Sequence, residues 1–233
     1  MTPLPITHAG TIDPHGTARA IDHQLPQNDT MVLFDRQLRP DVDTATMSRF
    51  GDDRWHLNEA IFEAAAAASS LNFTAIPAPL RNTAKHYVWH LINTDCPMAL
   101  NRASVGRYSL RTIASSWASL KDFFDWLHRR EIRDLGQVSR KILDDYLTDL
   151  SRTDASLRYK HKRINEVRRL WSYRVVLPEQ MTLPAPFPWG DDRGYEMFGK
   201  TVPAAENTTP RIAEKTMHSL LEWAMRFIED FFF

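Results

Sequence analysis

Apolar residues recur every three or four positions in several stretches of this chain, which is the spacing that builds one face of an α-helix. Residues 109–130 form the strongest stretch, and its apolar stripe is Ile113, Trp117, Leu120, Phe124 and Leu127. Residues 77–95 begin with prolines that suit a helix entry, and the stripe there is Leu80, Ala84, Val88 and Leu91. Ser139 can cap a third helix, over 139–152, whose inward side is Ile142, Leu143, Tyr146, Leu147 and Leu150.

A fourth helix is predicted over about residues 155–175, and its two sides differ in character. The segment RYKHKRINEVRRLW, from Arg158 to Trp171, contains six Lys and Arg residues, one His and a single acid. On a helical wheel the apolar residues cluster on one side: Leu157, Ile164, Val167, Trp171 and Val175. The opposite side carries Arg158, Lys162 and Arg169 with Asn165 beside them, and Arg163 and Arg168 flank the apolar stripe. Pro178 ends this segment.

The first 76 residues are predicted to be partly irregular, with one helix. Residues 1–50 are rich in Pro, Asp, Thr and His and show no sustained period, apart from a short strand expected at 31–34. Residues 52–70 include a run of alanines, the residue type with the highest helix propensity, and Asp52 or Asp53 can cap a helix there. We therefore predict the first helix of the chain at 52–70.

Six prolines interrupt residues 178–210, at positions 178, 184, 186, 188, 203 and 210. Such a stretch is neither a continuous helix nor a central strand, and its length favours a linker between domains. Helical spacing resumes over residues 209–233, whose apolar side is Met217, Leu220, Leu221, Ala224, Ile228 and Phe231.

The expected fold class is all-α, because four helices joined by short connections can form a compact bundle. The expected segments are a partly irregular N-terminal region at 1–76, a helical bundle at 77–178, a Pro-rich linker at 179–209 and one amphipathic helix at 210–233.

The composition of this 233-residue chain indicates the cellular compartment in which we expect it. Its one cysteine, Cys96, cannot form an internal disulfide. No apolar run approaches the roughly 20 residues that a membrane-spanning helix needs, and the opening residues lack the basic and apolar regions of a signal peptide. We therefore expect a cytoplasmic protein with no membrane partner.

The formal net charge is +0, but the charges are unevenly distributed. Residues 81–178 hold 19 Lys and Arg against 10 Asp and Glu, so the rest of the chain carries the opposite excess. A basic middle between acidic flanks favours a polyanionic partner. A solvated helix face usually mixes both signs of charge, whereas this basic side has almost no acids. We therefore predict DNA or RNA as the partner, contacted by Arg158, Lys162, Arg163, Asn165 and Arg169.

A second group of DNA-contacting residues is expected at the start of helix 109–130. Arg111, Ser115 and Ser119 are predicted to point away from the apolar stripe, and Thr112 lies at the helix entry. Hydroxyl residues and an arginine at a helix entry suit phosphate contacts. An ordinary polar helix face is the alternative explanation for this group.

Catalytic and metal chemistry find little support in the sequence. His86 and His90 are spaced as on one helix face with Cys96 nearby, but zinc needs three or four ligands on a fixed frame. Tyr195 lies in the Pro-rich segment and is interpreted as an aromatic anchor rather than a nucleophile. The sequence has no glycine-rich phosphate loop, and we expect no catalytic residue, metal or small-molecule cofactor.

The order of these segments resembles the core-binding domain of phage integrases and other tyrosine recombinases. The similarity lies in Thr112-Ile113 at a helix entry, an aromatic-rich helix through Phe123, Phe124, Trp126 and Leu127, a capped helix containing Tyr146, Leu147 and Leu150, and the segment from Arg168 to Tyr173. Residues 209–233, with the linker, resemble the lead into the catalytic domain of actinobacterial-type integrases. The resemblance covers about residues 77–230 and implies a SAM-like four-helix bundle whose second and fourth helices face DNA.

In that family a helical domain and a catalytic domain enclose the DNA, and the catalytic domain carries two Arg, a Lys, His residues and a Tyr nucleophile. This sequence stops at Phe233, one helix into the corresponding region. The resemblance therefore implies DNA binding, with self-association on the DNA, by a chain that is catalytically incomplete. A helical protein-interaction module without DNA binding, its acidic flanks folded onto its own basic face, is the alternative. An enzyme completed by a separate chain is a third option.

Overall fold

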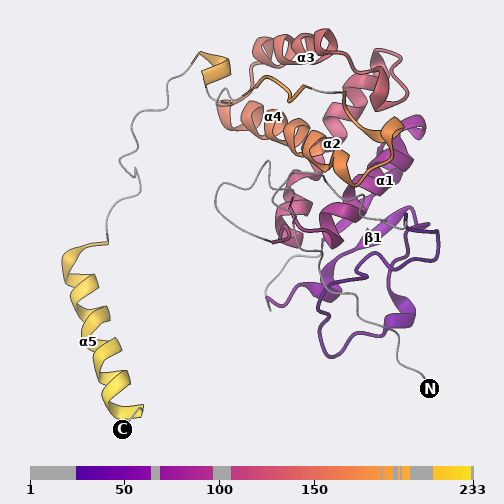
Figure 1. The fold of residues 1–233 in the computed structure, drawn as a ribbon. Coiled ribbons are helices and arrows are strands. Elements are labelled where there is room, and N and C mark those ends of the chain that lie inside the picture. The colour runs from indigo at the N-terminus through magenta and orange to yellow at the C-terminus, as the bar shows by residue number, and fades with distance from the viewer. Residues whose placement is uncertain are drawn as a thin grey trace, which may run out of the picture. The chain divides into compact units, whose positions relative to one another are not determined.

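The computed structural model describes residues 25–63, 69–96, 106–184, 186–190, 194, 196–199 and 212–231 (Figure 1). The chain divides into two compact units, residues 1–194 and residues 195–233. The first unit contains the helices α1 (Ala78–Asn93), α2 (Leu110–Arg129), α3 (Arg140–Arg152) and α4 (Leu157–Ser172), and the strands β1 (Arg54–His56) and β2 (Ser70–Asn72). The second unit contains α5 (Glu214–Phe231). The fold is mainly helical, as predicted.

The central element of the first unit is α1, which is buried on all sides along most of its length. The Tyr87 hydroxyl donates a hydrogen bond to Glu166 of α4 at 2.9 Å. The Trp89 indole donates to the Met31 carbonyl at 3.2 Å, and the Lys85 ammonium donates to a backbone carbonyl of the N-terminal region at 3.0 Å. Burial lowers the pKa of Lys85. The N-terminal region and the helices therefore share one core through α1.

Helices α2 and α3 begin and end within one residue of the sequence-based boundaries, and α4 begins two residues later and ends three residues earlier than predicted. Ser109 caps α2 and Ser139 caps α3, each by accepting a hydrogen bond from a backbone N–H in the first turn. The rings of Phe123 and Trp126 on α2 both lie 5.0 Å from the ring of Tyr146 on α3, centroid to centroid. These edge-on aromatic contacts fix α3 on α2.

The helix predicted at 52–70 is wrong. Strand β1 pairs antiparallel with β2, with Trp55 opposite Leu71, and both side chains are fully buried. The Trp55 ring packs on Phe73 at 4.4 Å. Core packing of this large aromatic residue therefore overrides local helix propensity; the alanines at 64–68 lie outside the described residues.

The short strand expected at 31–34 is also wrong, because Met31 makes only a single bridge, to Arg49. Val32 and Leu33 are nevertheless buried, in a turn.

Part of the predicted Pro-rich linker belongs to the first unit. The ring of Phe187 packs edge-on against Trp171 of α4 at 4.9 Å, and Arg168 donates to the Pro188 carbonyl at 3.2 Å. The division of the chain falls after residue 194 rather than near 178.

Candidate nucleic-acid interface

The candidate interface centres on α4, whose position is fixed by one buried side. Ser156 caps the helix by accepting a hydrogen bond from the Tyr159 N–H at 3.3 Å. Ile164, Val167 and Leu170 are at most 1% exposed. Among the other helices, α2 is the main neighbour of α4, and α3 also contacts it (Figure 1).

Arg158 and Lys162 lie on the opposite side of α4 and are both exposed. Within the described part of the chain, neither side chain makes an ion pair or a hydrogen bond. Asn165 is half-buried one turn further along, with its amide nitrogen 3.2 Å from the nearer ring nitrogen of His161. Three of the predicted α4 contacts thus share one accessible side.

Val175 was expected on the buried side but is 68% exposed. The α-helix ends at Ser172 and a 3₁₀ turn follows over 173–175. The tighter turn changes the helical phase, which rotates Val175 outward.

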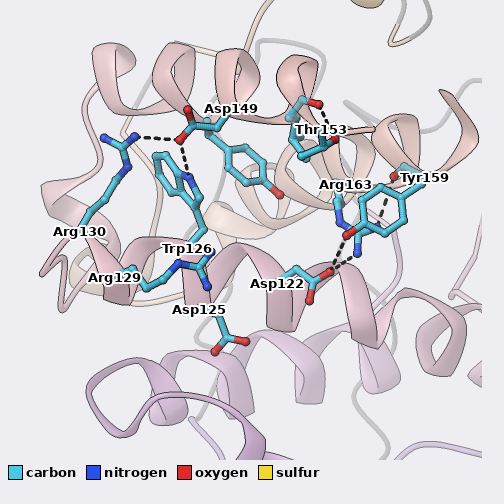
Figure 2. A pocket seen from close by; sticks show the side chains of 11 residues that line it. Asp122, Asp125, Trp126, Arg129, Arg130, Asp149, Thr153, Tyr159 and Arg163 are labelled. Carbon is cyan, nitrogen blue, oxygen red and sulfur yellow. Dashed lines mark hydrogen bonds and ion pairs between the residues drawn. The ribbon is translucent and has the colours of Figure 1, made fainter. Parts of the chain in front are cut away.

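Arg163 is 6% exposed and serves the fold. Its guanidinium pairs with the Asp122 carboxylate of α2 and stacks on the Tyr159 ring, 3.1 Å from the centroid. The Tyr159 hydroxyl also donates to Asp122, at 3.3 Å (Figure 2). Asp122 was not anticipated as a partner, and a sequence separation of 41 residues leaves no local signal for it.

Arg169 is likewise engaged inside the unit rather than lying beside Arg158 and Lys162, as had been expected. Its guanidinium pairs with the Glu166 carboxylate at 2.8 Å and lies over the Tyr108 ring, 4.5 Å from the centroid. Glu166 is 2% exposed. Burial by itself would lower the pKa of Arg169, but the neighbouring Glu166 carboxylate raises it above its usual value. The i, i+3 spacing is the one local signal for this pair.

A polar cluster surrounds that ion pair. The Tyr87 hydroxyl donates to the second oxygen of Glu166, and burial followed by the Glu166 charge raises the pKa of Tyr87. Tyr108 accepts a weak hydrogen bond from the Cys96 thiol at 3.4 Å. Burial, together with that contact, raises the pKa of Tyr108 to about 12. The cluster connects α1, the segment before α2, and α4.

The start of α2 presents the second predicted group. Arg111 is exposed and forms an ion pair with Glu63 at 3.5 Å. The Thr112 N–H donates to the Ser109 hydroxyl at 3.1 Å as the helix cap, and the Ser115 hydroxyl donates to the Thr112 carbonyl at 2.9 Å. Ser119, expected on the polar side, is instead 3% exposed.

A groove of about 530 Å³ lies among α2, α3 and the beginning of α4 (Figure 2). Arg130 pairs with Asp149 at 2.9 Å and stacks on Trp126 at 4.3 Å. The Trp126 indole also donates to Asp149 at 3.0 Å. That hydrogen bond, with the one from Arg130, lowers the pKa of Asp149. The Asp149 pair joins α2 to α3, and the pair between Arg163 and Asp122 joins α4 to α2.

Within the described ranges, no group of three or more His, Cys, Asp or Glu side chains could hold a metal ion. His86 packs against Phe50 at 4.8 Å instead, and burial lowers its pKa. None of the described helices is both long and apolar enough to cross a lipid bilayer. Tyr195 lies outside the described residues.

No protein-family model, curated protein or solved structure matches this chain.

Proposed function

We propose that this chain binds duplex DNA through the exposed cations of α4 and the first turn of α2, in the manner of the SAM-like core-binding domain of a tyrosine recombinase. The observation that carries the proposal is the pair Arg158 and Lys162. Both are exposed on one side of α4, and neither is neutralised by an acid within the described residues. Residues four positions apart are neighbours on a helix surface, so Arg158 and Lys162 can both contact one phosphate backbone.

The position of Arg158 on its helix adds to the argument. It lies in the first turn of α4, which contains no acidic residue. A cation there opposes the positive end of the helix dipole, so it weakens the isolated helix. The same arrangement attracts an anion, because the start of a helix and a guanidinium are both positively charged. A phosphate would relieve the unfavourable charge.

The first turn of α2 also lacks acidic residues and carries Arg111. Ser115 lies one turn further along α2 on the same side. Its hydroxyl proton is used within the helix, but its oxygen can accept. Arg111 therefore supplies the phosphate contact from α2, in exchange for its surface ion pair with Glu63. Such exposed pairs contribute at most about 1 kcal/mol.

One observation favours the alternative of a protein-interaction module. Three arginines of the basic segment are engaged inside the unit: Arg163 with Asp122, Arg168 with backbone carbonyls of residues 188–190, and Arg169 with Glu166. If these arginines served only to hold the segments together, the chain would bind DNA no more tightly than any other protein of similar net charge does.

The test is a titration of duplex DNA with the full chain and with the double variant Arg158→Ala/Lys162→Ala, at several salt concentrations. Each lost phosphate contact reduces the log–log salt slope by about 0.9. The double variant should therefore lose about 1.8 units of slope. Between 50 and 200 mM salt, the affinity of the unaltered chain should fall about tenfold more than that of the variant.

The matched control is Arg133→Ala/Arg140→Ala, which removes the same charge from exposed positions in the α2–α3 connection and at the start of α3. It should leave the slope nearly unchanged. Equal slopes for the two double variants, or no DNA binding by the unaltered chain at low salt, would favour the interaction-module alternative. Exposed substitutions of this kind usually change stability by less than about 0.5 kcal/mol, so thermal melts should coincide.

A further inference from the structure

Helix α5 of the second unit presents an apolar face to solvent. Every described side chain from residue 212 to residue 230 is exposed. The exposed fractions are 56% for Leu220, 56% for Leu221 and 55% for Ile228. In proteins, most of the stability of an amphipathic helix comes from packing of its apolar face. A contiguous exposed apolar stripe of this kind therefore marks an interaction surface.

The order of residues in α5 is symmetric about Ala224. Reading outward in both directions, each apolar position is matched by an apolar position and each polar position by a polar one, as far as Met217 on one side and Phe231 on the other. In two identical antiparallel helices related by a two-fold axis, residues equally distant from the crossing point lie at the same level. When a second copy crosses at Ala224, each apolar residue of one helix therefore lies at the same height along the pair as an apolar residue of the other.

The residue at the centre suits a close crossing. Ala224 has the smallest side chain in the stripe, so two helix backbones can approach there. Larger residues flank it by three and four positions on both sides: Leu220, Leu221, Phe227 and Ile228. These positions pack as the side rows of an antiparallel helix pair.

The charges of α5 also favour an antiparallel partner. Lys215 and His218 lie near the helix start, whereas Glu229 and Asp230 lie in the last turn, which has no basic residue. Glu214 offsets the charge of Lys215, and His218 lies 3.4 Å from Glu222 of the same helix. Acids in the last turn oppose the dipole of their own helix. An antiparallel second copy brings the positive end of its helix dipole alongside Glu229 and Asp230, so these acids gain a favourable partner between chains.

We propose that α5 pairs with α5 of a second copy of this chain, antiparallel and crossing at Ala224, to form a two-fold symmetric dimer. The partner is identified by the symmetry of the stripe and by the acids of the last turn, which an antiparallel copy places beside the start of its own helix. The pairing does not depend on DNA binding, so it stands or falls separately from the proposed function.

The first test is sedimentation equilibrium of the full chain over a range of concentrations. The unaltered chain should reach twice the mass of one chain. Leu220→Asp, which places a charge in the apolar stripe, should weaken the dimer by at least about tenfold. Ser219→Asp introduces the same residue one position away on the polar side and should leave the mass unchanged. A monomer at all concentrations, or equal effects of the two variants, would refute the proposal.

The second test fixes the direction of pairing by oxidative cross-linking in a Cys96→Ser background. Ala224→Cys should cross-link two chains, because the two 224 positions meet at the crossing point. Met217→Cys should not, because the two 217 positions would lie about 21 Å apart along an antiparallel pair. Cross-linking of both variants would indicate parallel helices, and cross-linking of neither would exclude a crossing at Ala224; either result overturns the proposed geometry.

Discussion

Replacing Arg169 by alanine should unfold the first unit more readily while leaving DNA binding intact wherever the unit remains folded. The Arg169 guanidinium lies 2.8 Å from one oxygen of Glu166, and Tyr87 donates to the other at 2.9 Å. Glu166 is 2% exposed, so the variant leaves a buried carboxylate without its counter-charge. Removing one partner of a buried ion pair costs about 3–5 kcal/mol.

That cost is large compared with the total stability of a domain, which is about 5–15 kcal/mol. For a unit of this size, each kcal/mol lowers the melting temperature by about 2–4 °C. The expected decrease is therefore roughly 6–20 °C, measured by circular dichroism during heating. The control is Glu166→Gln/Arg169→Met, which removes both charges and should recover most of the loss, because an uncharged pair leaves no buried ion unpaired.

The comparison separates a structural role from a DNA-contacting role for Arg169. At a temperature where Arg169→Ala remains folded, its salt slope for duplex DNA should equal that of the unaltered chain. A melting temperature within about 1 °C of the unaltered chain, accompanied by a slope flattened by about 0.9, would show that the Glu166 pair contributes little and that Arg169 contacts phosphate.

Two further predictions concern stability. Trp171→Ala should lower the free energy of unfolding by about 3–5 kcal/mol, because the ring is 7% exposed and packs on Phe187. Thermal melts measure this change. A decrease of less than about 1 kcal/mol would mean that this ring does not hold the 186–190 segment. Burial holds the pKa of His86 below its value of 6.5 in the unfolded chain, so the unfolded state binds more protons and stability should fall as the pH drops below about 6.5, by at most about 1.4 kcal/mol per pH unit. The difference between the urea midpoints at pH 7.5 and pH 5.5 should therefore be smaller for His86→Leu than for the unaltered chain. An equal difference in the two proteins would contradict the assignment of this pH dependence to His86.

The four helices of the first unit could be predicted from the sequence because their signals are local. Ser109 and Ser139 precede apolar stripes at helical spacing and do cap α2 and α3. A helix cap and an apolar stripe each involve residues within a few positions of one another, so both can be recognised in the sequence without knowledge of the fold. The same local reasoning failed at 52–70, where the alanine run favours a helix but Trp55 is held in a strand by packing against Phe73.

The partners of the basic residues could not be predicted for the same reason. Asp122 is 41 positions from Arg163, and Tyr87 is 79 positions from Glu166. These contacts depend on how α1, α2 and α4 pack together, and a helical wheel treats one helix alone. The wheel correctly placed Arg158 and Lys162 on the exposed side of α4.

The basic residues of α4 therefore divide into two groups with different consequences for DNA binding. Arg163 and Arg169 neutralise buried or half-buried acids, and moving either to a phosphate would leave its acid unpaired at a cost of several kcal/mol. Arg158 and Lys162 have no such cost, and Arg111 of α2 would exchange only a weak surface pair. Three phosphate contacts correspond to a salt slope of about −3, whereas engagement of all six Lys and Arg residues between 158 and 169 would give about −5. The measured salt slope thus reports whether the ion pairs of α4 remain closed when DNA binds. A slope near −3 is consistent with closed pairs. A slope near −5 would require the ion pairs to Asp122 and Glu166 to open on binding.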